Sequence, residues 1–387
     1  MIDSLAEKGQ EALKELSKKS QQEINDIVHQ MSMAAVDQHM HLAKLAYDET
    51  GRGIYEDKAI KNLYASEYIW NSIKDNKTVG IIGEDKQKGL TYVAEPIGVI
   101  CGVTPTTNPT STTIFKAMIA IKTGNPIIFA FHPSAQQSSK HAAKVILEAA
   151  IKAGAPKDCI QWIEIPSIEA TKQLMNHKDI ALVLATGGSG MVKSAYSTGK
   201  PALGVGPGNV PTYIEKTAHI KRAVNDIIGS KTFDNGMICA SEQVMVVDKE
   251  IYSDVVKEFK LHHTYFVNKN QLQQLEYAIM NEDKTAVKPD IVGKSAVSIA
   301  KLSGISVPEK TKLLVAEIDG IGKDYPLSRE KLSPLLAMVT AKSTRHALQI
   351  CEDTLNFGGL GHTAVIHTED SLSLIHISEP TRRTPIS

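Results

Sequence analysis

The sequence predicts an α/β protein built on parallel sheets with helices on both faces. Between residues 91 and 205, short apolar runs alternate with helical stretches about once per thirty residues, which is typical of βαβ units. The chain has 387 residues, of which 42% are hydrophobic and 22% are charged. That length and composition supply more than one hydrophobic core, so we expect two domains.

The first fifty residues predict helix. Their apolar side chains recur near a 3.6-residue period, and Gly51 and Gly53 end the pattern. A shorter helical stretch is expected at 58–73. In the alternating region that follows, the pattern predicts strands at 93–103, 126–131, 159–165 and 180–184, an apolar stretch near Leu203, and helices at 109–122, 134–153, 168–176 and 189–198.

A second α/β unit is predicted after Ser241. Its pattern indicates an entering helix at 218–230, strands at 243–247 and 311–317, helices at 252–262 and 270–281, and a strand–helix piece within 287–308. The boundary is expected near Phe233–Ser241, which divides the chain into domains 1–235 and 236–370. Residues 371–387 follow no helix or strand period and contain two prolines, so we expect a non-native or disordered tail there.

Charge and composition exclude several classes of protein. Lys plus Arg and Asp plus Glu both number 43, so the net charge is zero and the chain as a whole does not suggest a polyanion-binding protein. Aromatic residues make up 5%, which argues against a binder that stacks nucleic-acid bases. No apolar run is long enough to span a bilayer, and the N-terminus lacks the apolar core of a signal peptide. We therefore expect a cytoplasmic protein with reduced thiols.

Histidines and most cysteines have ordinary structural explanations. Cys101 and Cys159 lie in apolar strands and Cys351 in a helix, so we expect them to fill the core. No metal site is expected, because the closely spaced histidines have no cysteine or carboxylate partner at metal-ligand spacing; these histidines are His39, His41, His262 and His263.

Cys239 is the first candidate for chemistry. It follows a helical stretch and a polar turn with Gly236, in Lys231-Thr-Phe-Asp-Asn-Gly-Met-Ile-Cys, and a strand comes next. A thiol on such a turn at a domain boundary is well placed to face a cleft. The alternative is a small buried hydrophobic residue, the usual fate of a cysteine outside a disulfide.

Two glycine segments and one asparagine are further candidates. Thr186, Gly187, Gly188, Ser189 and Gly190 follow a strand and open a helix, where backbone N–H groups can meet an anion. The segment 203–209, with Gly206, fails the G-x-G-x-x-G pattern because Asn209 stands in the last place. The amide of Asn108, after a strand and between prolines, could donate to a developing oxyanion. Ordinary turn residues remain the alternative for all three.

Together these blocks resemble the aldehyde dehydrogenase superfamily, specifically its CoA-acylating branch. The resemblance covers 91–370 and is carried by 95–110, by 233–239 and by Asn356-Phe-Gly-Gly-Leu-Gly-His-Thr-Ala. It is closest to the aldehyde dehydrogenase half of bifunctional aldehyde–alcohol dehydrogenases. The implied fold is a Rossmann-type parallel-sheet cofactor domain with N-terminal helices at 1–235, and an incomplete α/β catalytic domain at 236–370.

The resemblance also implies a mechanism. The Cys239 thiolate would attack an aldehyde, and the amide of Asn108 with the Cys239 backbone N–H would hold the oxyanion. Hydride would pass to NAD, and CoA would take the acyl group from the Cys239 thioester. The implied cofactor residues are the loop at Thr186, Gly187, Gly188, Ser189 and Gly190, together with His132, Pro133, Gly206 and Glu330, the last holding the nicotinamide ribose.

Two departures from the wider family refine this reading. Hydrolytic members carry a water-activating Glu before the nucleophile, whereas 203–209 contains no acidic residue, which favours transfer to CoA over hydrolysis. Many relatives place Lys where His132 stands and Glu where Ala135 stands, to bind the adenosine ribose. That leaves the choice between NAD and NADP open from the residues, and the closer branch favours NAD.

Four alternatives stay open at this point. The enzyme could be a hydrolytic aldehyde dehydrogenase, could use a longer aldehyde such as succinate semialdehyde or butanal, or could belong to the neighbouring glutamate-5-semialdehyde reductases. It could also be an assembly protein that keeps only the contact surfaces of its relatives.

The resemblance implies partners as well. They are a small aldehyde, CoA and further copies of the chain, which would form filaments at full length, with no nucleic acid or membrane. Because the family pattern continues beyond residue 370, we expect missing strands, impaired assembly and low activity at this length.

Overall fold

The computed structural model describes residues 1–370, and the chain forms two compact units. The first comprises Met1–Gly51 and Tyr55–Gly206, and the second comprises Arg52–Ile54 and the chain from Pro207 onward. The division thus follows Gly206, whereas the boundary expected between residues 235 and 236 lies within the second unit. The functions assigned to the two domains stay predictions. The expectation for residues 371–387 lies outside the described residues.

A five-stranded parallel sheet forms the centre of the first unit. Its strands are β3 (Val99–Val103), β4 (Ile127–Ala130), β5 (Ile160–Trp162), β6 (Ile180–Thr186) and β7 (Ala202–Val205), in the order β5-β4-β3-β6-β7. The chain order therefore reverses between β3 and β6. This is the strand order of dinucleotide-binding folds, in which ligands bind beyond the carboxyl ends of the strands. The predicted parallel α/β fold is confirmed here.

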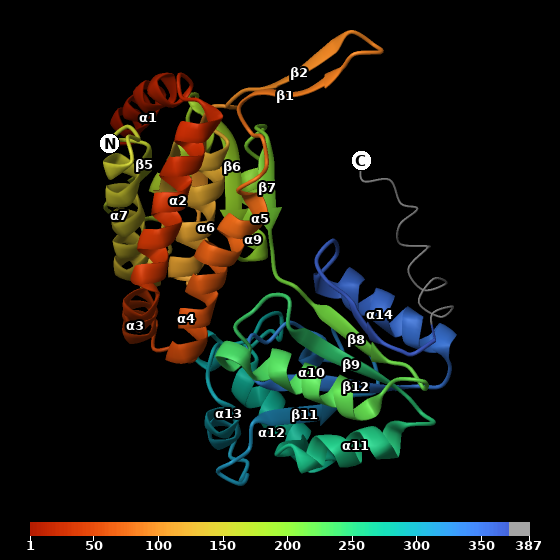
Figure 1. The fold of residues 1–387 in the computed structure, drawn as a ribbon. Coiled ribbons are helices and arrows are strands. Elements are labelled where there is room, and N and C mark those ends of the chain that lie inside the picture. The colour runs from red at the N-terminus through yellow and green to blue at the C-terminus, as the bar shows by residue number, and fades with distance from the viewer. Residues whose placement is uncertain (371–387) are drawn as a thin grey trace. The chain divides into compact units, whose positions relative to one another are not determined.

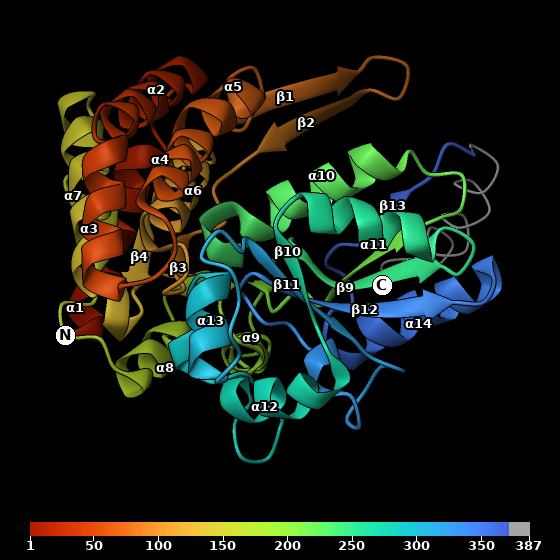
Figure 2. The same ribbon diagram turned by 90° about the horizontal axis from the view of Figure 1, so that it is seen from below.

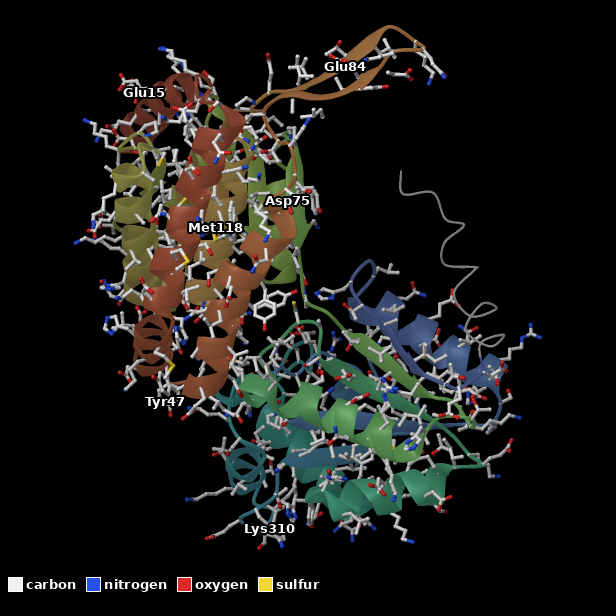
Figure 3. The ribbon with its side chains drawn as sticks, viewed as in Figure 1. Glu15, Tyr47, Asp75, Glu84, Met118 and Lys310 are labelled. Atoms are coloured by element: carbon white, nitrogen blue, oxygen red, sulfur yellow. The ribbon has the colours of Figure 1, made fainter. Side chains whose placement is uncertain are left out.

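Helices cover both faces of this sheet (Figure 1). On one face, α2 (Gln21–Asp37), α6 (Pro109–Lys122) and α7 (Gln136–Lys152) share a core with β3, β4 and β5. Figure 3 shows Met118 of α6 inside this helical layer, where its side chain is fully buried. On the other face, α8 (Ile168–Asn176) and α9 (Ser189–Tyr196) pack on β3 and β6.

The N-terminal fifty residues form three helices rather than one. They are α1 (Ile2–Leu16), α2 and α3 (His39–Thr50). Ser20 and Glu23 form a capping box that starts α2 as a separate helix. The Ser20 hydroxyl accepts the backbone N–H of Glu23, and the Glu23 carboxylate accepts the backbone N–H of Ser20. Gly51 ends α3 in the left-handed conformation, with φ of 62°. The expected helix at 58–73 is α4 (Tyr55–Leu63), a π-helical turn (Tyr64–Tyr68) and α5 (Ile69–Ile73).

The first unit also carries a hairpin that the sequence pattern did not predict. Strands β1 (Gly80–Asp85) and β2 (Leu90–Ala94) pair antiparallel and extend away from the helices (Figure 1). Figure 3 places Glu84 on this arm, and apolar side chains such as Ile81 and Val93 are exposed there. The hairpin lacks the alternation of buried and exposed positions that identifies a strand against a core.

The second unit is built on a six-stranded parallel sheet. Its order is β10-β11-β12-β9-β8-β13, with β8 (Val210–Ile214), β9 (Glu242–Asp248), β10 (Thr264–Val267), β11 (Leu313–Glu317), β12 (Leu335–Ala341) and β13 (Val365–His367). Helices α10 (Ile220–Thr232) and α11 (Tyr252–Leu261) pack on one face (Figure 2). Helix α14 (Thr344–Gly358) packs on the other face. A second α/β unit is therefore confirmed.

One expected element of the second unit is wrong. No strand begins the 287–308 segment, which forms a 3-10 turn (Pro289–Ile291) and then α13 (Ala296–Leu302). Pro289 has no N–H to give a neighbouring strand, and Gly293 adopts a φ of 73° that ends any extended run. Helix α13 and α12 (Lys269–Ile279) share a core with β10 and β11.

Candidate functional site

The predicted cofactor residues of the first unit lie at one edge of its sheet. Asn108 follows β3, His132 and Pro133 follow β4, the Thr186–Gly190 turn follows β6, and Gly206 follows β7. All these strands are parallel, so their carboxyl ends lie along the same edge. The structure therefore brings these sequence-predicted residues to neighbouring strands, on either side of the point where the strand order reverses.

The turn after β6 has the form of an anion-binding turn. Gly188 is the N-cap of α9, and no side chain caps this helix. A methyl group added at Gly188 or Gly190 would meet nothing within 4 Å, so the backbone is open to an approaching group. The partial positive charge of a helix N-terminus favours a phosphate at this place. The described residues thus fit a dinucleotide pyrophosphate here.

A buried lysine joins the two strands at the reversal point. The Lys116 ammonium donates to the carbonyl oxygens of Val103 in β3 and Leu184 in β6, each at 2.6 Å. Burial lowers the pKa of Lys116 to about 7, and the nearby Cys101 opposes that shift. Burial also raises the pKa of the Cys101 thiol to about 12, so this cysteine is a core residue as expected.

His132 begins the turn after β4. Its Nδ1 accepts the backbone N–H of Ser134 at 3.1 Å and so caps the 3-10 turn Pro133–Ala135. The ring is exposed, whereas Ala135 is fully buried. Ala135 therefore offers no polar side chain that could bind a ribose. The exposed surface of this turn comes from His132 and Pro133.

In the second unit, Cys239 lies at the amino end of β9, after a turn of unusual backbone geometry. Asp234 and Asn235 have φ of 49° and 51°, and Gly236 has φ of 72°. Three left-handed residues in succession are costly for non-glycine side chains, and such strain concentrates at functional sites. At Gly236 a methyl group would lie 2.7 Å from the backbone carbon of Ser333, so only glycine fits.

Further bonds hold this turn. The Asp234 carboxylate accepts the backbone N–H of Ile54 at 2.7 Å, and the Asn235 amide donates to the carbonyl of Gly293 at 3.0 Å. The turn that precedes Cys239 is therefore held by contacts with two segments remote in the sequence.

Gly208 lies against the backbone of Cys239. A methyl group on Gly208 would lie 2.1 Å from the carbonyl oxygen of Cys239 and 3.1 Å from the ring of His362. His362 precedes β13, and its Nδ1 is 2.8 Å from the hydroxyl of Thr363. Burial lowers the pKa of His362, which favours the neutral imidazole at neutral pH. The Cys239 backbone and the His362 ring thus flank the same glycine.

Glu330, in the loop before β12, contacts the same segment. Its Oε1 accepts the Gly208 N–H at 2.9 Å. Burial raises the pKa of Glu330 to about 7, although the Gly208 N–H, Lys231 and Lys331 act in the opposite direction. This carboxyl group therefore holds the glycine segment beside Cys239, and it titrates near neutral pH.

The residue after Glu330 fixes its backbone. The Lys331 ammonium donates to the carbonyls of Arg329, Leu327 and Gln243 at 2.6, 2.8 and 3.1 Å. The buried Gln243 side chain accepts from Lys231 Nζ at 2.9 Å and from the Lys331 N–H at 3.0 Å. Gln243 therefore ties the end of α10, the start of β9 and the Glu330 segment together.

The sequence interpretation missed three of these groups. His362, Lys331 and Gln243 were given no role, although His362 stands in the late glycine block that carries part of the resemblance. That block was the available signal. Asn108 belongs to the first unit and Cys239 to the second.

Among residues 1–370, no group of three or more His, Cys, Asp or Glu side chains could hold a metal ion. In the same part of the chain, no helix has the length and apolar character needed to cross a membrane. All four cysteines are thiols.

Comparison with known proteins gives consistent matches. The aldehyde dehydrogenase family model matches residues 1–383. An aldehyde-alcohol dehydrogenase of Streptococcus pneumoniae is 55% identical over 346 residues, which are 88% of this chain and 39% of that protein. The chain thus spans about two fifths of the length of that curated relative.

Solved structures resemble the chain over almost all of its length. An acetylating aldehyde dehydrogenase of Geobacillus thermoglucosidasius has a TM-score of 0.95 at 47% identity, covering 98% of this chain and 83% of that one. A propionaldehyde dehydrogenase of Rhodopseudomonas palustris, solved with bound CoA and an acylated cysteine, has a TM-score of 0.86 at 29% identity and covers 98% of this chain and 85% of that one. The predicted resemblance and fold are both confirmed.

Proposed function

The chain belongs to the aldehyde dehydrogenase family, and on that premise we propose that it is an NAD-dependent, CoA-acylating acetaldehyde dehydrogenase. It converts acetaldehyde, CoA and NAD to acetyl-CoA and NADH, and it catalyses the reverse reaction. The observation that carries the proposal is the fixed turn at Cys239, with the Gly208 backbone against its carbonyl and the His362 ring on the same glycine. A similar chain is named as acetylating, which supports this branch.

The proposed reaction begins at Cys239. Its thiolate bonds to the aldehyde carbon, and the carbonyl oxygen takes the negative charge. The Asn108 amide and the Cys239 backbone N–H donate hydrogen bonds to that oxygen, which lowers the energy of the thiohemiacetal. NAD, when bound, accepts the hydride that leaves the former aldehyde carbon, and Cys239 is left as a thioester.

Acyl transfer to CoA completes the turnover. The segment 203–209 carries no acidic side chain, so it offers no carboxylate to activate water. We assign the proton of the CoA thiol to His362, because its ring lies against the same Gly208 as the Cys239 carbonyl and burial lowers its pKa, which favours the neutral imidazole. The CoA sulfur then bonds to the acyl carbon and the Cys239 thiolate leaves.

Cofactor binding falls mainly to the first unit. The backbone of Thr186, Gly187, Gly188, Ser189 and Gly190 would hold the pyrophosphate at the start of α9. His132 and Pro133 would contact the adenosine ribose, and Gly206 would leave room beside the turn. Glu330 would accept from the nicotinamide ribose with the oxygen that does not bind Gly208. We also propose a homo-oligomer, supported by the exposed apolar side chains of the β1–β2 hairpin.

The test is NADH formation from acetaldehyde with and without CoA. We expect turnover that needs CoA, that disappears in Cys239→Ala, and that leaves an acetyl group on Cys239 when CoA is omitted. Cys351→Ala is the matched control, because this thiol lies on α14 and its pKa is raised to about 12 by burial. Equal NADH formation without CoA would favour the hydrolytic alternative, and acetylation of another cysteine would refute the role of Cys239.

A further inference from the structure

The side chain of Asn108 is held from α4. Asn108 is the N-cap of α6, yet its side chain does not cap that helix. The Lys61 ammonium of α4 donates to the amide oxygen of Asn108 at 2.7 Å, and the amide nitrogen donates to Thr107 Oγ1 at 3.2 Å. An N-cap asparagine ordinarily accepts a backbone N–H with this oxygen, so its use by a lysine is a departure from the usual pattern.

A lysine at this position determines which way the amide points. An ammonium group only donates, so it can bond the carbonyl oxygen of an amide but never the NH2 group. The oxygen of Asn108 must therefore face Lys61, and the NH2 group must face away. One N–H goes to Thr107, and the second remains for an acceptor such as an oxyanion. A positive charge on the amide oxygen also polarises the N–H bonds and makes them stronger donors.

The neighbouring residue fixes α4 against α6. Asn62 is fully buried; its amide oxygen accepts from Thr110 Oγ1 at 2.8 Å, and its nitrogen donates to the His39 carbonyl at 3.0 Å. Lys61 contacts Asn108, and Asn62 contacts Thr110. Both contacted residues lie at the start of α6. The bond from Lys61 is therefore set in place by the packing of a whole helix, directly before the π-helical turn that begins at Tyr64.

We propose that Lys61 is a positioning residue that orients and polarises the Asn108 amide for oxyanion binding. This inference rests on the proposed function, because it needs Asn108 to stabilise the oxyanion. Lys61 acts through Asn108 and need not touch the substrate. Its removal should therefore lower kcat while leaving the affinity for NAD unchanged.

The test is a double-mutant cycle with Lys61→Met, Asn108→Ala and the double variant, measured by kcat, KM and NAD affinity. Loss of an oxyanion donor lowers kcat by about a hundredfold or more, and we expect Lys61→Met to lower it by about tenfold. In the Asn108→Ala background the same change should cost less than about twofold, because residues that act as a unit are not additive. Lys61→Arg should regain most of the loss, since a guanidinium also only donates.

Controls separate this inference from a general effect on folding. Lys74→Met removes a similar lysine–asparagine bond, to Asn71 Oδ1 at 3.2 Å on the exposed α5 segment, and it should leave kcat unchanged. If Lys61→Met unfolds, Lys61→Gln takes its place in the cycle, because a glutamine removes the charge and no longer forces the amide oxygen of Asn108 to face it. Additive losses, or a fall in NAD affinity equal to the fall in kcat, would overturn the inference. Failure of the proposed function is distinct, because the wild-type chain would then lack CoA-dependent turnover.

Discussion

The two parallel sheets present their candidate residues at opposite ends of their strands. In the first unit, Asn108, His132 and the 186–190 turn all follow strands, at the carboxyl ends. In the second unit, Gly208, Cys239, Glu330 and His362 all precede strands, at the amino ends. The first arrangement obeys the general rule for ligands on open α/β sheets, and the second does not.

The difference follows from what each end of a strand offers. After a strand, the chain turns into the N-terminus of a helix, where unpaired backbone N–H groups attract phosphate. The residues before the strands of the second unit do not open a helix: Gly208 follows β7, and Cys239 follows the 3-10 turn Phe233–Gly236. The candidate residues at the amino ends are therefore held by close backbone contacts, as at Gly208 and Gly236, and not by a helix N-terminus. The two units thus position their candidate residues in different ways.

The largest expected effect breaks the amino-end edge. Gly208→Ala would force a methyl group into the carbonyl of Cys239, now 2.1 Å from that position, and we expect loss of nearly all turnover. Affinity for NAD, measured by fluorescence titration, should change little, because the anion-binding turn lies in the first unit. Gly229→Ala is the matched control: this residue lies in α10 with nothing within 4 Å of an added methyl group. Equal losses of turnover and of NAD affinity in Gly208→Ala would contradict this division of labour.

The next effect concerns the stability of the carboxyl-end edge. The pKa of Lys116, about 7 when folded, lies below the ordinary 10.5, so the penalty of charging it is complete below pH 7 and fades as pH rises toward 10. The wild type should gain stability over Lys116→Met between pH 7 and 9.5, by at most about 3.5 kcal/mol. The denaturant midpoints of the wild type and of Lys116→Met, measured across that pH range, test this prediction. A difference between the two midpoints that stays constant with pH would refute it.

A smaller effect of opposite sign is expected at the amino-end edge. The pKa of Glu330, about 7, lies above the ordinary 4.5, so its charged form is penalised fully above pH 7 and the penalty fades as pH falls toward 4.5. Relative to Glu330→Gln, the wild type should lose stability from pH 5 to 8, by at most about 3 kcal/mol. Thermal unfolding at both pH values measures this, and a wild type that gains over the variant as pH rises would show the sign to be wrong.

The smallest effect sharpens the assignment of the phosphate turn. Gly188 has φ of −65° and ψ of 163°, which aspartate adopts easily at an N-cap. Gly188→Asp should stabilise α9 yet weaken NAD binding by about tenfold, because its charge opposes the pyrophosphate. Gly188→Asn gives the neutral control and should weaken binding much less. Calorimetric titration with NAD measures the affinity of both variants. Equal affinities of Gly188→Asp and Gly188→Asn would show that the pyrophosphate does not bind at this turn.

Local sequence patterns predicted much of the fold but few of the contacts that form the candidate site. Between 91 and 205 the periods of two and 3.6 residues, with glycines at the turns, located β4, α8 and the 186–190 turn close to their observed positions. Strands β10, β12 and β13 were not assigned, because short apolar runs look alike in helices and strands. The hairpin β1–β2 was missed because it packs on no core.

The site itself depends on contacts between distant residues. Nothing in the sequence places Gly208 against Cys239, Lys61 against Asn108 or Gln243 against Lys331, since each contact is created by the topology. The three blocks of the resemblance identified Cys239 and Asn108 as candidates, and their assigned roles stay predictions. Only the fold shows which side chains hold them.

Residues Arg52–Ile54 belong to the second unit although they lie within the part of the chain that forms the first. Helices α3 and α4, on either side of them, belong to the first unit. The N–H of Ile54 donates to Asp234, and the N–H of Gly53 donates to the Gly293 carbonyl. A gene segment that starts at Pro207 would therefore encode the turn before Cys239 without the Arg52–Ile54 peptide that hydrogen-bonds to it. Recombination between relatives at that point would therefore separate the second unit from three residues that belong to it.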